Sequence, residues 1–297
     1  MQTIPIVFCF DKRILLGAGV SIKSLIDSAK PTTSYDIRIF HSDIPESKQK
    51  AFFSLIDGTQ HKMRFHKIDA SRFKGFPCNQ GSWRENVYYR FLIPEVLTEY
   101  DNAIYSDVDV FFCRDMADVF QTDISEYQLA AVRAERNCED GMICHRYFEE
   151  NKKDFVFWSG FFIVNCKRFR DENLLDKFFE YAEILKNKLC FFDLDLMNAV
   201  CQKIKPIPFE YVCLEAIYEF EDIAKVEDYA YLKNVYSDTE LLDAKKNPAI
   251  IHYAGELGKP WHRKKYPEYY ERVVKALPKA LRTYTFRDLR KRFFSKI

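Results

Sequence analysis

The chain lacks the features that mark membrane-spanning, nucleic-acid-binding and dinucleotide-binding proteins. No uninterrupted apolar run approaches the ~18 residues of a membrane span, and the opening residues, MQTIPIVFCF, enter a strand-like run without a signal-peptide pattern. Lys and Arg number 45 against 44 Asp and Glu, so the net charge of +1 gives no reason to expect a nucleic-acid partner. Neither a Gly-x-Gly-x-x-Gly motif nor a Walker loop occurs, so any bound phosphates need another means of neutralisation.

The nine cysteines are odd in number and include no Cys-x-x-Cys pair. Several lie within apolar runs, where cysteine packs as a small hydrophobic residue. With 47% hydrophobic and 16% aromatic residues, the 297-residue chain can bury a large core without disulfide bonds. We therefore expect a globular protein with reduced thiols, located in the cytoplasm.

The stretch Asn102–Phe112, NAIYSDVDVFF, interrupts an apolar strand pattern with Asp107 and Asp109. Burying unpaired carboxylates is costly, so a strand that ends in two of them is expected to present both to a cation. Open α/β sheets bind ligands at this end of their strands, and oxygen ligands one residue apart suit Mg²⁺ or Mn²⁺. The alternative is a strand-end turn with two solvated acids.

Apolar periodicity in the first part of the chain alternates between the periods of strands and helices. This predicts an α/β fold with a βαβ opening and a mixed, mostly parallel central sheet flanked by helices. The expected elements are strands at Ile4–Phe10, Tyr35–His41 and Met63–Ile68, a helix from Leu15 to Ala29, a helix at Glu46–Ile56, a helix containing Tyr88, Phe91, Leu92 and Leu97, and the strand through Asp107.

Beyond residue 120, short polar islands separate the apolar runs. Residues 133–155 are charged and weakly periodic, which predicts a surface loop or lid. The run Val156–Val164 predicts a strand, in which Ser159 and Gly160 indicate either a close approach to the backbone or a bulge.

A helix is expected to begin at Asp193-Leu194-Asp195. Cap preferences alone favour Asp193 as its N-cap residue. The apolar stripe that defines this helix consists of Met197, Val200, Cys201 and Ile204.

The segment Ile250–Trp261, IIHYAGELGKPW, combines a short strand with His252, two glycines and Lys259. An imidazole can ligate a metal, Gly255 and Gly258 allow close backbone approach, and the lysine supplies a positive charge. Together these groups predict a site for a metal-bound diphosphate. A single histidine is otherwise more often a structural hydrogen-bond donor.

The C-terminal residues 282–297, RTYTFRDLRKRFFSKI, contain six basic residues and one acid. Their apolar residues fall near one helical face, which is typical of a segment lying on an anionic membrane surface. The alternative is a solvated helix packed on the body of the protein. The apolar face consists of Phe286, Leu289, Phe293 and Ile297.

The order and spacing of these motifs resemble glycosyltransferase family 8, of the bacterial lipopolysaccharide galactosyl- and glucosyltransferase kind. The resemblance covers most of the chain. Its motifs are the strand ending at Asp11, Tyr89-Arg90 before Asp107, the Phe157–Asn165 strand, the segment Asp193-Leu-Asp195-Leu-Met-Asn198, and His252-x-x-Gly followed by Lys-Pro-Trp.

The resemblance implies a GT-A glycosyltransferase domain over residues 1–262 and a helical, basic-aromatic segment over 263–297. Within the domain, residues 1–120 would bind the nucleotide, and 121–262 would hold the acceptor and metal. The implied reaction transfers a hexose, glucose or galactose, from a UDP-sugar with Mn²⁺ or Mg²⁺, retaining the anomeric configuration. The implied acceptor is a saccharide or lipid-linked glycan such as lipopolysaccharide. The basic C-terminal segment indicates that this acceptor lies at the inner face of a membrane.

The resemblance also implies roles for individual residues. The metal ligands would be Asp107, Asp109 and His252. The catalytic residues would be Asp193, Arg90 and Asp195. Contacts to the nucleotide-sugar would come from Asp11, Arg90, Asp107, Val108, Ser159, Gly160, Asp193, Gly255, Gly258 and Lys259, with Asp11 at the uracil and Lys259 at the diphosphate.

Two departures from the family pattern have consequences. Ile14 stands where many members carry an aromatic residue that stacks on the base. Leu194 replaces a glutamine between the two aspartates, so a mechanism with that side chain as nucleophile cannot operate. We therefore expect front-face substitution, in which an oxygen of the leaving diphosphate takes the acceptor proton. The alternatives from other classes are an aspartyl-phosphate phosphatase and a non-catalytic scaffold that binds nucleotide-sugar.

Overall fold

Seven strands form the central sheet in the order β3-β2-β1-β4-β7-β6-β8. The computed structural model describes residues 2–78, 84–138, 141 and 150–295. Strands β3, β2, β1 and β4 are parallel, β7 runs antiparallel to β4 and β6, and β8 is parallel to β6. The strands are β1 (Gln2–Cys9), β2 (Thr33–His41), β3 (Lys62–Lys67), β4 (Asn102–Ser106), β6 (Leu129–Arg136), β7 (Phe155–Asn165) and β8 (Ile204–Ile207). This mixed, mostly parallel sheet confirms the predicted fold class.

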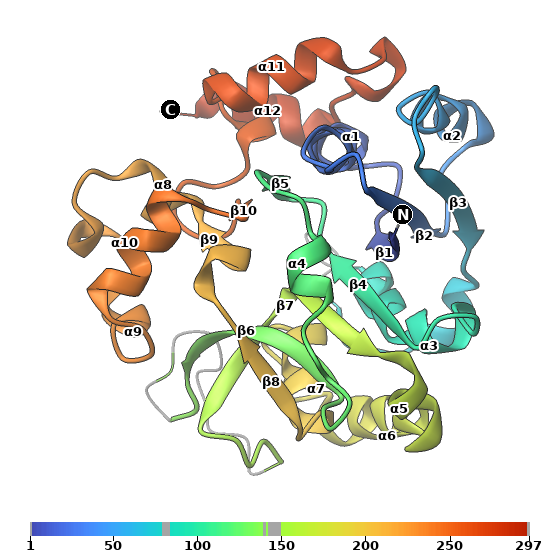
Figure 1. The fold of residues 1–297 in the computed structure, drawn as a ribbon, viewed down its shortest axis with the longest axis vertical. Helices are drawn as coiled ribbons and strands as arrows, with labels where there is room; N and C mark the ends of the chain where they lie inside the picture. Colours follow the sequence, from blue (N-terminus) through green and yellow to red (C-terminus); the bar gives the residue numbers. More distant parts are fainter. Residues whose placement is uncertain (1, 79–83, 139–140, 142–149, 296–297) are drawn as a thin grey trace.

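Both faces of the central sheet are covered. Along β1, Ile6 and Phe8 belong to one buried apolar cluster, whereas Val7 and Cys9 belong to another on the opposite face. A parallel strand buried on both faces carries a nearly continuous apolar run, which is why β1 was visible in the sequence. The helix α1 (Leu15–Asp27) joins β1 to β2 on the first face (Figure 1).

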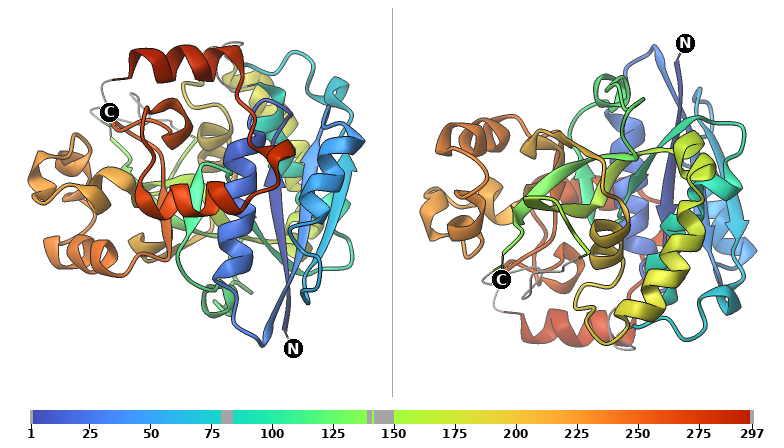
Figure 2. Two further views of the ribbon diagram at one scale, coloured as in Figure 1. Left: turned by 90° about the horizontal axis from the view of Figure 1, so that it is seen from above. Right: turned by 90° about the horizontal axis from the view of Figure 1, so that it is seen from below.

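Helices also cover the second face of the central sheet. On the second face lie residues of α5 (Cys166–Asp171), α6 (Leu174–Leu185) and α7 (Asp193–Val200). Figure 2 shows α11 (Glu268–Ala276), in red, beside α1, in blue. The other α-helices are α2 (Glu46–Phe53), α3 (Ile93–Val96), α4 (Ala117–Phe120), α8 (Glu215–Glu219), α9 (Tyr229–Leu232), α10 (Asp238–Lys246) and α12 (Phe286–Phe294). The 3-10 helices are η1 (Ala70–Phe73), η2 (Glu85–Leu92), η3 (Phe209–Val212), η4 (Ile223–Lys225), η5 (Pro260–His262) and η6 (Lys279–Leu281).

The structure describes no helix that is both long and apolar enough to cross a membrane.

A second, small sheet has the order β5-β10-β9, formed by β5 (Val110–Phe112), β10 (Ile250–His252) and β9 (Cys213–Leu214). The expectation of one continuous strand through Asn102–Phe112 is therefore wrong. The chain leaves the central sheet after Ser106 and enters the small sheet at Val110, where β5 pairs antiparallel with β10. The apolar pattern continues on both sides of the aspartates, so it does not reveal this change of sheet.

Three further element predictions need correction. The helix expected around Tyr88 is the 3-10 helix η2 followed by the single turn α3, because Pro94 has no N–H with which to continue an α-helical ladder. The predicted lid begins later than residue 133, since β6 continues to Arg136. There the guanidinium groups of Arg133 and Arg136 lie 4.4 and 5.4 Å from the centre of the Phe155 ring, which accommodates charge beside the strand. Residues 139–140 and 142–149 of that predicted lid lie outside the described residues.

The third correction concerns α7, which ends at Val200, so Ile204 is not part of its apolar stripe. Ile204 instead begins β8 and pairs with Leu129 of β6. Pairing between distant strands overrides the helical spacing that the sequence shows at this position.

Candidate active site

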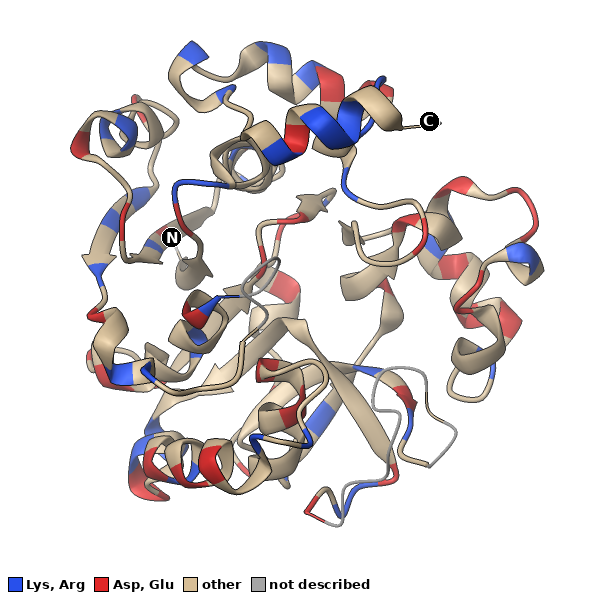
Figure 3. Ribbon diagram, turned by 180° about the vertical axis from the view of Figure 1, so that it is seen from behind, with Lys and Arg blue, Asp and Glu red and all other residues tan. Residues whose placement is uncertain are grey.

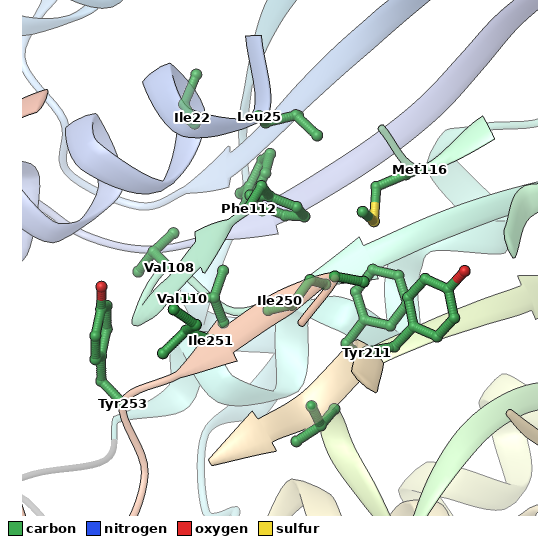
Figure 4. Packing of buried hydrophobic residues seen from close by; sticks show 14 of the residues in the cluster. Ile22, Leu25, Val108, Val110, Phe112, Met116, Tyr211, Ile250, Ile251 and Tyr253 are labelled. Atoms are coloured by element: carbon green, nitrogen blue, oxygen red, sulfur yellow. The ribbon is translucent and has the colours of Figure 1, made fainter. Parts of the chain in front are cut away.

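The two aspartates that separate β4 from β5 are held by backbone hydrogen bonds to neighbouring strands. The N–H of Asp107 donates to the carbonyl of Gly160 in β7 over 2.8 Å, and the carbonyl of Asp109 accepts from the N–H of Tyr253 over 2.9 Å. Between them, Val108 is buried with Val110 and Ile251 in the core (Figure 4). The alternation of buried valines with aspartates therefore directs both carboxylates away from the core.

Asp107, Asp109 and His252 come together as a candidate metal centre. One ligand atom from each lies within 4.8 Å of the others, and His252 Nε2 is 3.6 Å from Asp109 Oδ1. The strand register explains the arrangement, because His252 pairs with Val110, the residue next to Asp109. The two carboxylates are ligands suited to Mn²⁺ or Mg²⁺, and the imidazole is a ligand typical of transition metals.

Gly160 preserves the space between these ligands. A Cβ atom at this position would lie 2.8 Å from His252 Cε1 and 3.1 Å from Asp107 Oδ2. Any side chain would therefore crowd the centre of the cluster. The structure supports both interpretations of this glycine, because His252 and Asp107 approach it closely and the β6–β7 register is irregular where the partners change from Phe162 to Phe157. The three ligands fit a divalent cation.

Lys259 also reaches this centre. Its ammonium group binds the Asp109 carboxylate and donates to the carbonyl of Tyr253 over 2.6 Å. Burial of Asp109 opposes its ionisation, but Lys259 and His252 outweigh that effect and hold the pKa of its carboxyl well below the usual range. The ammonium group thus lies beside a candidate metal ligand. Lys259 follows a turn in which Gly255 and Gly258 have φ angles of 93° and 64°, values that favour glycine.

Arg90, from η2, links Asp107 to Asp193. Its Nη2 donates to Asp107 Oδ1 over 3.0 Å, and its Nη1 lies 2.9 Å from Asp193 Oδ2 and 2.7 Å from the carbonyl oxygen of Ser159. The guanidinium lies 4.2 Å from the centre of the Tyr105 ring, and the Tyr105 hydroxyl donates to Asp107 Oδ1 over 2.6 Å. Arg90 is 5% exposed, so its guanidinium group is held within this network away from solvent.

Asp193 is the first residue of α7, but its carboxylate does not take the capping role that cap preferences favoured. Phe192 occupies the N-cap position with a positive φ of 49°. Asp193 Oδ2 instead accepts from the Ser159 hydroxyl over 2.8 Å and faces Arg90. Burial raises the pKa of Asp193 to about 6, with Arg90 acting in the opposite direction.

Asp195 and Asn198 hold the backbone around this site. Asp195 Oδ2 accepts from the N–H groups of Cys190 and Phe191 over 2.6 and 2.8 Å. The Asn198 amide exchanges two hydrogen bonds of 2.9 Å with the N–H and carbonyl of Phe157 in β7. The catalytic role expected for Asp195 stays a prediction. The sequence analysis assigns no role to Asn198. A polar amide inside an apolar helical stripe nevertheless indicates a side chain that makes specific hydrogen bonds.

Asp11 follows β1, whose end lies beside the end of β4 because Phe8 pairs with Ser106. It is buried, and its carboxylate binds Nε and Nη2 of Arg13 over 2.7 and 2.6 Å. Within the part of the chain that the structure describes, this pair is separate from the network around Arg90. Its expected contact with the base stays a prediction.

The chain is similar to known proteins in sequence and in fold. Residues 5–265 match Glycosyl transferase family 8. The chain is 24% identical to Glycosyltransferase GlyA of Streptococcus pneumoniae over 75% of its own length, but it spans only 28% of that protein. It is 25% identical to Lipopolysaccharide 1,3-galactosyltransferase of Salmonella typhimurium, with 86% of this chain and 72% of the relative covered.

Among solved structures, the galactosyltransferase LgtC in complex with donor and acceptor sugar analogues is similar, with a TM-score of 0.73 and 21% identity. The likeness covers 97% of this chain and 100% of LgtC, and it shows that the fold is GT-A. Because the family match spans most of the residues, from strand β1 to η5, the chain belongs to glycosyltransferase family 8 and is a glycosyltransferase.

Proposed function

We propose that this protein is a metal-dependent, retaining hexosyltransferase that moves glucose or galactose from a UDP-sugar to a saccharide acceptor of lipopolysaccharide or another surface glycan. The observation that carries the proposal is the convergence of Asp107, Asp109 and His252 around the side-chain-free position Gly160. A bound Mn²⁺ or Mg²⁺ would neutralise the charge of the leaving diphosphate.

The protein's own residues supply the remaining electrostatics. Lys259 lies beside Asp109 and would offer its ammonium group to the diphosphate, while the turn of Gly255 and Gly258 allows close backbone approach. Asp11 would accept from the uracil edge. These groups bind and orient the nucleotide part of the donor.

The donor sugar would lie beside Arg90 and Asp193. Arg90 holds Asp107 and Asp193 at fixed positions, and Ser159 fixes the Asp193 carboxylate with a second hydrogen bond. A carboxylate held in this way is a directional acceptor for sugar hydroxyls and stabilises positive charge developing at the anomeric carbon.

We infer front-face substitution at that carbon. Leu194 is buried against Ala134 and Val156 and has no nucleophilic atom. The bond from the anomeric carbon to the diphosphate breaks, the acceptor oxygen bonds to the same face, and an oxygen of the departing diphosphate takes the acceptor proton. This assignment leaves Asp193 as a binding group rather than a nucleophile.

The C-terminal helix α12 supports a membrane-associated acceptor on the cytoplasmic side. Phe286, Phe293 and Phe294 are each more than 70% exposed, and Lys and Arg residues are concentrated on the same helix (Figure 3). Asp288 anchors the helix through a contact of 2.9 Å with His262, so the exposed phenylalanines are not needed to hold it on the body. Aromatic and basic side chains together suit an anionic lipid surface.

The experiment that tests this function is UDP release from a panel of nucleotide-sugars, with Mn²⁺ and with EDTA. We expect one hexose donor to be hydrolysed or transferred only with metal, and Asp109→Ala to remove that activity. Asp118→Ala, which changes an exposed aspartate on α4, is the matched control and should leave activity unchanged. Metal-independent turnover, or equal activity in Asp109→Ala, would contradict the proposal.

A further inference from the structure

The turn that precedes Lys259 is stabilised by a buried ion pair between Arg263 and Glu215. The turn runs from Gly255 to Gly258 and is closed by a hydrogen bond of 3.2 Å from the N–H of Gly258 to the carbonyl of Gly255. Both glycines have positive φ angles, so the backbone between β10 and η5 is unusual and needs external support to keep one conformation.

Arg263 supplies that support. Its Nε donates to the carbonyl of Leu257 over 3.1 Å, and its Nη2 donates to the carbonyl of Gly258 over 2.6 Å. The same guanidinium binds both carboxylate oxygens of Glu215, with Nη1 2.8 Å from Oε1. A planar guanidinium can hold two carbonyls and a carboxylate together, whereas a lysine ammonium cannot reproduce this fork.

Glu215 connects the turn to the candidate metal centre. It begins α8 directly after β9, and in β9 the preceding Leu214 pairs with His252. The strand register therefore fixes the position of Glu215 relative to His252. Because Arg263 binds both Glu215 and the carbonyls of the turn, it also fixes the position of the turn and of Lys259. Glu215 is 1% exposed and Arg263 is 5% exposed.

Stability alone is a weak reason for this pair. A buried ion pair recovers little beyond the cost of removing both charges from water, and apolar replacements of both partners are often neutral or stabilising. A second contact also tethers the turn, because Glu256 Oε1 accepts from the N–H of Glu227 over 3.0 Å. The turn is thus held by two separate sets of contacts, which indicates that its position matters.

We propose that Arg263 and Glu215 are positioning residues that fix the Gly255–Gly258 turn, and with it Lys259, for binding of the donor diphosphate. The inference rests on the proposed function and goes beyond it by assigning this pair a role in donor affinity. Neither residue touches the reacting atoms in this account; both act through the turn.

The test compares Mn²⁺-dependent UDP binding by calorimetry with amide hydrogen exchange of residues 255–259. The variants are Arg263→Lys and the double variant Arg263→Met with Glu215→Met, which removes the pair without leaving a buried charge. We expect both variants to bind UDP roughly ten-fold more weakly, because ordering the loosened turn on binding costs free energy, and about 1.4 kcal/mol corresponds to that factor. We also expect the amide hydrogens of the turn to exchange faster in both variants.

Arg38→Lys is the matched control. Arg38 is also buried in a pair, with Asp36 and Glu99, but it lies on β2, two strands from β4 in the sheet order. Both Arg38→Lys and Arg263→Lys are expected to lose stability, but Arg38→Lys should keep both the UDP affinity and the exchange of the turn unchanged.

The outcomes separate the inference from the proposed function. If the wild-type protein binds UDP with Mn²⁺ and both Arg263 variants bind it equally well, the inference is overturned. If the turn amides of the variants are as protected as those of the wild type, the proposed ordering of the turn is also overturned, whether or not UDP binds. Absence of metal-dependent UDP binding in the wild type would instead overturn the proposed function.

Discussion

Gly160 lies so close to His252 that a Cβ atom on it would be 2.8 Å from the imidazole Cε1. This distance is shorter than carbon atoms can approach without displacement. Strand β7 therefore leaves space in the candidate metal centre, because Gly160 has no side chain to fill the region between Asp107 and His252.

The substitution Gly160→Ala is expected to weaken Mn²⁺ binding by about 10–100-fold, the range found when the surroundings of metal ligands are disturbed. The added methyl group would displace His252 or Asp107. Titration of Mn²⁺ followed by calorimetry checks the prediction. Gly19→Ala is the control, because its Cβ would meet the flexible end of Leu277, 3.0 Å away in the core, and should affect stability without affecting metal affinity. Wild-type Mn²⁺ affinity in Gly160→Ala would contradict the assignment.

Leu194→Gln tests the inferred mechanism. Leu194 is buried with Ala134 and Val156, so a glutamine there should lower the free energy of unfolding by about 1–3 kcal/mol through its buried amide. The anomeric configuration of the product, read from the proton NMR spectrum, should remain that of the donor. Because double displacement also retains it, the readout that separates the two mechanisms is a covalent bond between the sugar and the enzyme. Leu194→Met is the control for side-chain shape. A sugar covalently trapped on Asp193 would show a double-displacement reaction and would contradict front-face substitution.

The stability of the protein should depend on pH through Lys153. Burial lowers the pKa of its ammonium group to about 8, although the group donates to the carbonyls of Asn198 and Cys201 at the end of α7. Between that value and the ordinary lysine pKa of ~10.4, the unfolded chain binds the proton and the folded chain does not, so the contribution of Lys153 to stability rises with pH.

Urea unfolding of wild type and Lys153→Met at several pH values from 7 to 11 checks this prediction. The difference in free energy of unfolding between the two proteins should shift in favour of the wild type as pH rises. A constant difference, or one that moves in the opposite direction, would show that Lys153 has an ordinary pKa. Lys205→Met, which removes an exposed hydrogen bond to the Asp123 carbonyl, is the control and should give no such trend.

The three exposed phenylalanines of α12 predict membrane binding. Replacing Phe286, Phe293 and Phe294 with serine should weaken binding to phosphatidylglycerol vesicles by at least about ten-fold, because each buried aromatic ring contributes roughly 1.5–3 kcal/mol. Sedimentation with vesicles measures the effect. Ile184→Ser, on α6, removes another exposed apolar side chain and should not change it. Equal binding of the triple variant, or wild-type protein that stays in solution, would refute membrane association.

The sequence was most informative where a segment's own pattern decides its structure. The strands β1 and β7 consist mainly of apolar residues, and the sequence predicts both close to their observed limits. Asp107, Asp109 and His252 stood out because polar residues interrupt or end apolar strands. Their convergence follows from the pairing of β5 with β10, which the pattern alone does not specify.

Other features depend on contacts between distant segments and could not be predicted. The charged end of β6 was interpreted as part of a lid, because the ring of Phe155 that lies beside Arg133 and Arg136 comes 19 or more residues later. Glu215 and Arg263 are 48 residues apart and each resembles an ordinary surface charge. Only the fold reveals that they are buried together behind the turn that carries Lys259.

The most direct test of the central claim is a calorimetric titration of UDP into the wild-type protein, once with Mn²⁺ and once with EDTA. If Asp107, Asp109 and His252 hold the cation that the donor diphosphate requires, UDP binds with Mn²⁺ and binding is lost with EDTA. Equal binding under both conditions, or no binding under either, would contradict the account of this site.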